Sequence, residues 1–338
     1  KTTSSSMIAH ILNECGIDVI AFLGGISLNF NSNLSFNKNA KTMVVEADEF
    51  DRSFLTLSPD LALVTSLDAD HLDVYEQENE MIKSYQDFVK KIKVDGILIT
   101  KPNFLNLLNV NENITYKSYS NEDEANFKAT AINIKEGNYF VDIDCEGIVT
   151  PEIKLGLPGI HNVENAIGSF AISKEIDLDY DKIKEALASY CGVKRRFEYR
   201  IKTSSIVYID DYAHHPTEIE VCVKSVKELY PNKKITGIFQ PHLYTRTRDF
   251  AIEFAKSLSL LDELILLDIY PARELPIAGI SSEIILKDVK SSQKGLIANE
   301  NLLNHISKND YEVILTLGAG DIDLFVEPIT EILMQRIK

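Results

Sequence analysis

Short apolar runs alternate with amphipathic stretches along the first half of the chain. Residues 43–45 and 61–65 are apolar runs typical of buried strands. The spacing of apolar residues over 79–93 predicts a helix, and a further strand follows at 96–100. Strands that alternate with helices are typical of a parallel sheet. From about 115 to 155 the pattern changes to alternating segments separated by turns, which predicts antiparallel strands appended to that sheet.

Helical patterns follow at 161–176 and 180–190, and the alternation begins again after residue 195. Strands are expected at 206–209, 235–239, 263–267 and 313–317. Helices are expected at 216–229, 245–260, 283–289, 300–306 and 322–336. We therefore expect an α/β protein of two domains. Residues 1–195 would form a central parallel-sheet domain with an antiparallel appendage, and residues 196–338 a C-terminal Rossmann-like α/β domain.

Composition and charge narrow the class of protein. The 338 residues are 45% hydrophobic, enough for two well-packed cores. The net charge of −16 argues against a protein that coats nucleic acid or an anionic membrane. Apolar runs all fall short of the roughly 18–20 residues of a membrane span. The four cysteines lie far apart in the sequence, as in a reduced, cytoplasmic protein. We expect a monomer or homodimer.

The chain begins with Lys1-Thr2-Thr3, followed by serines and an apolar helix from Met7. A lysine and a hydroxyl residue at a helix start match the end of a P-loop-type phosphate loop. There the lysine neutralises phosphate charge and the hydroxyl coordinates magnesium. Hydroxyl residues before a helix are also ordinary helix caps. Because Lys1 replaces the usual methionine, we expect a cut chain that lacks the glycine-rich half of the loop.

Acidic clusters follow two of the expected strands. Glu46–Asp51 offers several carboxylates, and Asp68–Asp73 adds the imidazole of His71. Ligands collect at the carboxyl ends of strands in α/β sheets, and one or two carboxylates suffice for Mg²⁺ beside phosphate and water. A solvated acidic turn and a structural histidine are the alternatives for the two clusters.

Two further motifs flank the end of the first domain. Pro158–Asn165 opens a helix, and its asparagine amides could bind the edge of a heteroaromatic ring such as adenine or could cap the helix. Lys194–Phe197 holds the tight basic cluster of an acidic chain. Arginine matches the geometry of phosphate oxygens, although a solvated hinge would have the same composition.

Four polar blocks follow strands of the second domain. Asp210–Glu218 offers carboxylates and imidazoles, and Gln240–Asp249 offers a histidine and two arginines suited to a carboxylate or phosphate. These arginines could equally pair with local acids. Asp268–Glu274 and Leu317–Asp321 form similar strand ends, and the glycines of the last block permit close approach of the backbone.

Taken together, the motifs resemble those of the Mur ligases from Lys1 to the C-terminal helix. The Asp210–Glu218 and Gln240–Asp249 blocks are the most specific, and they resemble the branch that adds L-alanine and the branch that recycles murein tripeptide. The context Phe50–Phe54 fits the alanine branch better. In chain order the motifs are Lys-Thr-Thr, Glu-Ala-Asp-Glu, Asp-Ala-Asp-His, Pro-Gly-x-His-Asn, Arg-Arg-Phe, Asp-Asp-Tyr-Ala-His-His-Pro-Thr-Glu, Gln-Pro-His-x-Tyr-Thr-Arg-Thr-Arg and Tyr-Pro-Ala.

This resemblance implies an ATP-dependent ligase of peptidoglycan precursor synthesis that joins L-alanine to UDP-N-acetylmuramic acid through an acyl phosphate. Family members have an N-terminal domain for the UDP-sugar, a central ATPase domain and a C-terminal domain. We expect the first of these to be missing here. The alternatives are the murein tripeptide ligase, a nucleotide-binding module without turnover, and a folate polyglutamylating ligase, against which the Asp210–Glu218 block argues.

The resemblance also implies roles for individual residues. The catalytic set would be Lys1, Glu46, His71, Arg196 and His242. The ATP site would be Lys1, Thr2, Thr3, His161, Asn162, Asn165, Arg196, Asp210 and Asp211, and the magnesium ligands Thr2, Glu46 and His71. Tyr212, His214, His242 and Arg246 would form the alanine and acyl-phosphate site. Many relatives have a basic residue where this chain has Leu243, so the carboxylate clamp would depend more on Arg246 and backbone amides.

Overall fold

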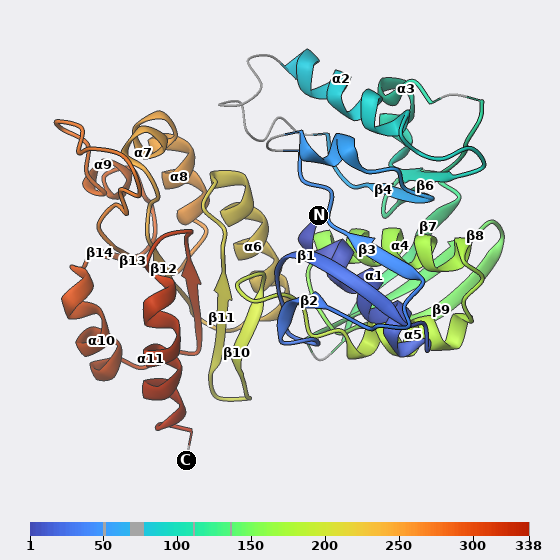
Figure 1. Ribbon diagram of the computed structural model, residues 1–338. Coiled ribbons are helices and arrows are strands. Elements are labelled where there is room, and N and C mark those ends of the chain that lie inside the picture. The colour runs from blue at the N-terminus through green and yellow to red at the C-terminus, as the bar shows by residue number, and fades with distance from the viewer. Residues whose placement is uncertain (50–51, 68–77, 111, 136, 338) are drawn as a thin grey trace. The chain divides into compact units, whose positions relative to one another are not determined.

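The computed structural model describes residues 1–49, 52–67, 78–110, 112–135 and 137–337. The chain folds into two compact units, Lys1–Val193 and Lys194–Lys338 (Figure 1). The sequence placed the division two residues later. None of the helices within the described ranges is long and apolar enough to cross a membrane. The four cysteines are free thiols.

The first unit contains two sheets. The smaller sheet has the order β2-β1-β3, where β1 is Val19–Ser27, β2 is Ser32–Ser35 and β3 is Thr42–Val45. Strands β1 and β3 are parallel, and β2 pairs with β1 in the antiparallel direction. Strands β1 and β2 were not predicted from the sequence.

The larger sheet of this unit has six strands in sequence order. Its first four strands are parallel, and the last three form an antiparallel meander. Antiparallel strands were predicted from about residue 115, but the strand at Thr115–Ser120 is parallel to both of its neighbours. The strands are β4 Leu61–Val64, β5 Ile97–Thr100, β6 Thr115–Ser120, β7 Phe127–Lys135, β8 Asn138–Cys145 and β9 Ile148–Leu155.

Helices cover both sheets. Helix α1 (Thr2–Glu14) packs on β1 and β3, and α4 (Ile160–Glu175) crosses the larger sheet and packs against α1. Helix α5 (Tyr180–Ser189) packs on β9 and α1. The remaining elements are α2 Glu78–Val89, α3 Leu105–Leu108 and the 3₁₀ turns η1 Ser53–Thr56 and η2 Pro102–Phe104. Helix α1 begins five residues before the expected apolar start, because its serines are buried and Ser5 Oγ bonds back to the Lys1 carbonyl at 3.3 Å.

The second unit is a six-stranded sheet of order β10-β11-β15-β12-β13-β14. All neighbours are parallel except β10, which is antiparallel to β11. Because β15 lies between β11 and β12, the strand order reverses there, which in doubly wound sheets marks the ligand crevice. The strands are β10 Glu198–Lys202, β11 Val207–Asp211, β12 Ile235–Phe239, β13 Glu263–Leu266, β14 Gln293–Leu296 and β15 Val313–Leu317.

Helices lie on both faces of this sheet (Figure 1). Ile238 of β12 joins one core cluster with residues of α10 and α11, while its neighbour Phe239 lies 5.3 Å from the Phe254 ring of α8 on the other face. This alternation confirms the expected Rossmann-like α/β class. The helices are α6 Pro216–Leu229, α7 Tyr244–Asp249, α8 Ala251–Leu258, α9 Glu283–Leu286, α10 Asn299–Lys308 and α11 Asp323–Met334.

The second unit departs from the sequence analysis at three places. The helix expected over 245–260 is divided at Phe250, whose backbone leaves the helical conformation. Strand β10 was not predicted, although its residues alternate between polar and apolar. Strand β14 was not predicted either. Gln293–Leu296 is a mostly exposed edge strand, and only its pairing with β13 defines it as a strand.

Candidate active site

Thr2 and Glu46 meet in the first unit, as the sequence predicts for a magnesium site. Thr2 lies at the start of α1 and Glu46 directly follows β3. Thr2 Oγ1 donates a hydrogen bond to Glu46 Oε1 at 2.8 Å. Ser5, one turn along α1, donates from Oγ to Glu46 Oε2 at 3.4 Å. The carboxylate is thus held over the first turn of the helix, where backbone amides favour anions.

Gly24 of β1 completes the surroundings of Glu46. Its backbone amide donates to Glu46 Oε2 at 2.7 Å. A Cβ at Gly24 would lie 2.6 Å from both carboxylate oxygens, so only glycine leaves room for this contact. Gly24 was not among the residues predicted from the sequence, although the Gly-Gly pair at the end of an apolar run was a visible signal of close approach.

Lys1 faces the acids that follow Glu46. Its Nζ bonds Glu49 and lies 3.4 Å from Asp48 Oδ1. Glu49 is buried. The ammonium expected to neutralise phosphate is therefore within reach of two carboxylates. Thr3 lies in the first turn of α1, and its carbonyl accepts a hydrogen bond from Tyr190 Oη at 3.2 Å.

The two asparagines at the start of α4 connect that helix to α1. Asn162 is buried, and its Nδ2 donates to the Pro158 carbonyl at 2.7 Å. Asn165 Nδ2 donates to Asn162 Oδ1 at 3.2 Å, and Asn165 Oδ1 accepts from Ser4 Oγ at 2.9 Å. These contacts place the pair beside α1, the helix predicted to follow a phosphate loop. Their role at adenine, with that of the neighbouring His161, stays a prediction.

The oxygens of Thr2 and Glu46 fit a magnesium ion, which prefers oxygen donors and binds through one or two carboxylates plus phosphate and water. Within the described ranges there is no cluster of three or more His, Cys, Asp or Glu that would form an all-protein cage. His71, the third predicted ligand, lies outside the described residues.

In the second unit the predicted residues gather at the carboxyl ends of β11, β12 and β15. Gln240, which follows β12, joins two of these ends. Its Nε2 donates to Asp321 Oδ1 at 2.6 Å, and its Oε1 accepts from the Ile322 amide at 2.9 Å. A Cβ at Gly320 would lie 2.4 Å from Gln240 Oε1, so this glycine permits the close packing expected of the Leu317–Asp321 block.

Asp210 is fully buried and has partners for both carboxylate oxygens. Thr316 Oγ1 donates to Oδ1 at 2.6 Å, and Arg195 Nε donates to Oδ2 at 3.0 Å. Arg195 also donates to the Gly318 carbonyl at 2.7 Å. Burial raises the pKa of Asp210, although Arg195 and Thr316 oppose that rise. Of the two adjacent arginines, Arg195 therefore joins the ends of β11 and β15.

Asp211 and Arg196 are both partly exposed. Asp211 accepts the amides of Phe197 at 2.8 Å and Ala213 at 2.7 Å. Burial raises the pKa of Asp211 to about 6, against the opposing charge of Arg196. The Arg196 guanidinium lies 5.3 Å from the centre of the Tyr212 ring, a distance that allows a cation–π contact. Arg196 is thus held partly exposed, as a phosphate-binding arginine requires.

His214 and His242 lie together, with ring centres 6.1 Å apart, and Tyr270 stacks on His242 at 5.7 Å. Burial lowers the pKa of both histidines, and the nearby charges of Arg246 and His214 help to bring that of His242 to about 4. Both rings are therefore neutral at pH 7. The positive charge near these rings comes from Arg246 and, at His214, also from Arg196.

Arg246 carries the feature most indicative of a ligand. Its Nη1 is buried and has no hydrogen-bond partner in the part of the chain that the structure describes, and the same holds for His242 Nδ1. A buried donor without a partner costs roughly 1–3 kcal/mol, and more when it is charged. A carboxylate or phosphate oxygen bound here would satisfy Arg246, in line with the substrate site predicted from the sequence.

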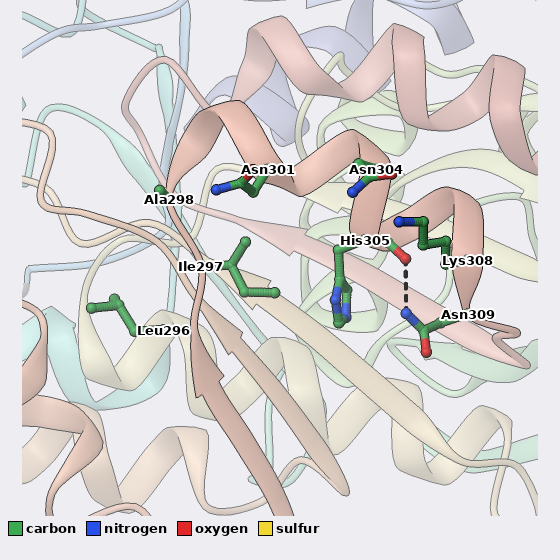
Figure 2. A pocket seen from close by; sticks show the side chains of 8 residues that line it. All are labelled: Leu296, Ile297, Ala298, Asn301, Asn304, His305, Lys308 and Asn309. Carbon is green, nitrogen blue, oxygen red and sulfur yellow. Dashed lines mark hydrogen bonds between the residues drawn. The ribbon is translucent and has the colours of Figure 1, made fainter.

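A separate surface hollow lies between the end of β14 and α10 (Figure 2). Asn301, Asn304, His305 and Lys308 project from α10 along it, and Asn309 Nδ2 donates to the His305 carbonyl at 2.8 Å. None of the site residues predicted from the sequence lines this hollow.

Comparison with known proteins identifies the family. The Mur ligase middle domain matches residues 1–173, and the Mur ligase glutamate ligase domain matches residues 195–320. The chain therefore belongs to the Mur ligase family, which confirms the resemblance seen in its motifs.

Individual relatives give a narrower comparison. The chain is 47% identical to the UDP-N-acetylmuramate–L-alanine ligase of Parabacteroides distasonis, covering 100% of this chain and 73% of that protein. It is 48% identical to the enzyme of the same name from Christiangramia forsetii, covering 99% and 72%. The solved UDP-N-acetylmuramate–alanine ligase of Thermotoga maritima superposes with a TM-score of 0.84 at 26% identity, covering 100% of this chain and 74% of that one.

Proposed function

We propose that this protein is a cytoplasmic, ATP-dependent ligase that joins L-alanine to UDP-N-acetylmuramic acid in peptidoglycan precursor synthesis. The observation that carries this proposal is 47–48% identity with enzymes of that name across essentially the whole chain. The clusters around Glu46 and Arg246 support it, because together they offer sites for a metal-bound phosphate and for a small anion.

The reaction has two steps. A carboxylate oxygen of UDP-N-acetylmuramic acid attacks the γ-phosphorus of ATP, the bond to the β,γ-bridging oxygen breaks, and ADP leaves. The neutral amine of L-alanine then attacks the acyl carbon of the resulting acyl phosphate. The tetrahedral intermediate collapses with loss of inorganic phosphate, and the nitrogen gives up a proton to form the amide. Both steps bring anions together, so catalysis depends on positioning and charge neutralisation.

In the first unit, Thr2 and Glu46 would hold the magnesium ion, which supplies neutralisation of phosphate charge when bound. Lys1 exchanges its contacts with Glu49 and Asp48 for the phosphates of ATP. The amides of the first turn of α1 point toward the same anion. Asn162 and Asn165 keep α4 against α1, beside the nucleotide.

In the second unit, Arg246 binds an anionic oxygen of the amino acid or acyl phosphate through its partnerless Nη1. His242 is neutral at pH 7, so its Nδ1 can donate or accept without adding charge. Tyr212 and His214 form the wall beside it, with ring centres 5.2 Å apart. Arg196 contributes a second cation, toward ATP phosphate.

The test is a product assay in the full-length protein. We expect ADP and phosphate to form over many turnovers only when both UDP-N-acetylmuramic acid and L-alanine are present, because without L-alanine the acyl phosphate is not consumed. A preference for murein tripeptide over L-alanine would favour the recycling ligase instead. Calorimetric binding of ATP and magnesium without turnover under any substrate combination would favour a nucleotide-binding module.

A further inference from the structure

Helix α7, which carries Arg246, begins where the local sequence gives no reason for a helix to start. Its N-cap residue is Leu243, whose side chain has no oxygen to accept a backbone hydrogen bond. Leu243 also has φ 70° and ψ 138°, a region that residues with a Cβ rarely occupy. A contact from elsewhere in the chain must therefore stabilise this start.

Glu274 supplies that contact from the segment after β13. One carboxylate oxygen accepts the Thr245 amide at 3.0 Å, and the other accepts the Thr245 hydroxyl. The segment itself is held by the Glu274 amide, which donates to the Pro271 carbonyl at 2.9 Å. Although burial acts to raise it, the pKa of Glu274 lies below its ordinary value, because the hydroxyl of Thr245 and the amides of Thr245 and Tyr244 donate to the carboxylate. Glu274 thus replaces the missing cap of α7.

The position of Arg246 depends on this arrangement. Within the described part of the chain its Nη1 has no partner that would fix the guanidinium from the far end. The placement of α7 therefore decides where the guanidinium points. His242 immediately precedes Leu243, and Glu274 also acts on His242 through its charge. The Glu274 carboxylate thus influences both His242 and Arg246.

We propose that Glu274 is a positioning residue that fixes α7 and so sets the affinity of the Arg246 site for the amino-acid substrate. This inference rests on the proposed function, in which that substrate is L-alanine. Glu274 itself touches no reacting atom, so its loss acts on binding of the amino acid and leaves binding of ATP unchanged.

The test compares Glu274→Ala and Glu274→Gln with Glu283→Ala, which removes an exposed acid from the first turn of another helix, α9. We expect KM for L-alanine to rise about tenfold or more in Glu274→Ala and less in Glu274→Gln, whose amide oxygen still accepts one bond. In both variants KM for ATP should stay within about twofold of wild type, and Glu283→Ala should match wild type throughout.

A failure of the proposed function can be distinguished from a failure of the positioning role of Glu274. If wild-type enzyme continues to form ADP over many turnovers without L-alanine, the proposed function is refuted and this inference is refuted with it. If wild type requires L-alanine and Glu274→Ala leaves its KM unchanged, the positioning role alone is refuted. A parallel rise in the KM of all three substrates, with a loss of folded protein by circular dichroism, would also refute it, because that pattern reports general destabilisation.

Discussion

Thr2 Oγ1 donates a hydrogen bond to Glu46 Oε1 at 2.8 Å across 44 positions of sequence. The contact joins the first turn of α1 to the end of β3, and it brings together two oxygen donors suited to magnesium. Neither the start of α1 nor the end of β3 indicates a magnesium site by itself. The fold brings the two together, and together they form the candidate site.

Removing the Glu46 carboxylate should abolish most turnover. Glu46→Gln keeps an oxygen for the Gly24 amide but removes the charge, and Glu46→Ala removes both. We expect ADP formation to slow by roughly 100-fold or more in each, since the carboxylate proposed to hold the magnesium ion is lost. Circular dichroism should show the fold retained, because Glu46 is partly exposed.

Glu122→Gln, on an exposed turn after β6, is the control and should have wild-type rates. The sequence-based prediction for His71 is examined in the same assay with His71→Ala, which should also be slow. Wild-type rates in both the Glu46 and His71 variants would refute the metal assignment.

A methyl group at Gly24 should disturb the proposed magnesium site and leave the fold intact. In Gly24→Ala the new Cβ would lie 2.6 Å from both Glu46 oxygens, and a flexible carboxylate can move away. We expect the Mg²⁺ concentration for half-maximal activity to rise roughly tenfold, the effect typical of disturbing a group that orients a metal ligand. Gly295→Ala is the matched control, because nothing lies within 4 Å of its Cβ. Equal Mg²⁺ dependence in the two variants would contradict the role of Gly24.

Replacing Arg246 with an uncharged residue should stabilise the folded protein and weaken binding of the amino acid. Arg246→Met removes a buried donor that has no partner in the described structure, so we expect the free energy of unfolding to rise by about 1 kcal/mol. We expect KM for L-alanine to rise roughly 10- to 100-fold, the loss of a charged hydrogen bond. Thermal unfolding and initial rates measure the two effects. Arg248→Met, on the same helix but exposed and paired with Asp249, should change KM little. An unchanged KM in Arg246→Met would exclude Arg246 from the site.

The buried histidine makes stability depend on pH with a defined sign. The folded protein holds the pKa of His242 at about 4, below the ordinary value of 6.5, mainly through burial. The unfolded chain therefore takes up the proton at higher pH, and stability present above pH 6.5 is lost as the pH falls toward 4. After allowance for partial exposure, this loss should be about 1–2 kcal/mol.

Protonation of Asp211 changes the stability in the opposite direction over part of the same pH range. Burial raises its pKa to about 6, so the folded protein gains relative stability as the pH falls from 6. Urea unfolding of His242→Gln beside wild type, from pH 7.5 to 4, cancels the Asp211 contribution and isolates that of His242. The variant should lose less stability on acidification. A constant difference between the two proteins at every pH would show that His242 does not titrate in this way.

Much of this protein could be predicted from its residues in order. The apolar runs at 43–45 and 313–317 and the periodicity of 216–229 correspond to β3, β15 and α6. The meander of β7–β9 was visible as alternation around a turn at Gly137. Such elements are predictable because their side-chain period is set locally by helix and strand geometry. The motif blocks also placed the chain in its family.

Long-range pairing decided the rest. Strands β2 and β14 are polar and short, and they are strands only because β1 and β13 offer hydrogen bonds beside them. Arg195 and Arg196 are adjacent and chemically identical, and both lie over the Tyr212 ring, yet it is Arg195 that tertiary contacts pair with the buried Asp210. The sequence alone determined the kind of chemistry present at each strand end. Only the tertiary structure decided which groups satisfy one another and which, like Arg246 Nη1, remain for a ligand, because burial and hydrogen-bond partners depend on residues far away in the chain.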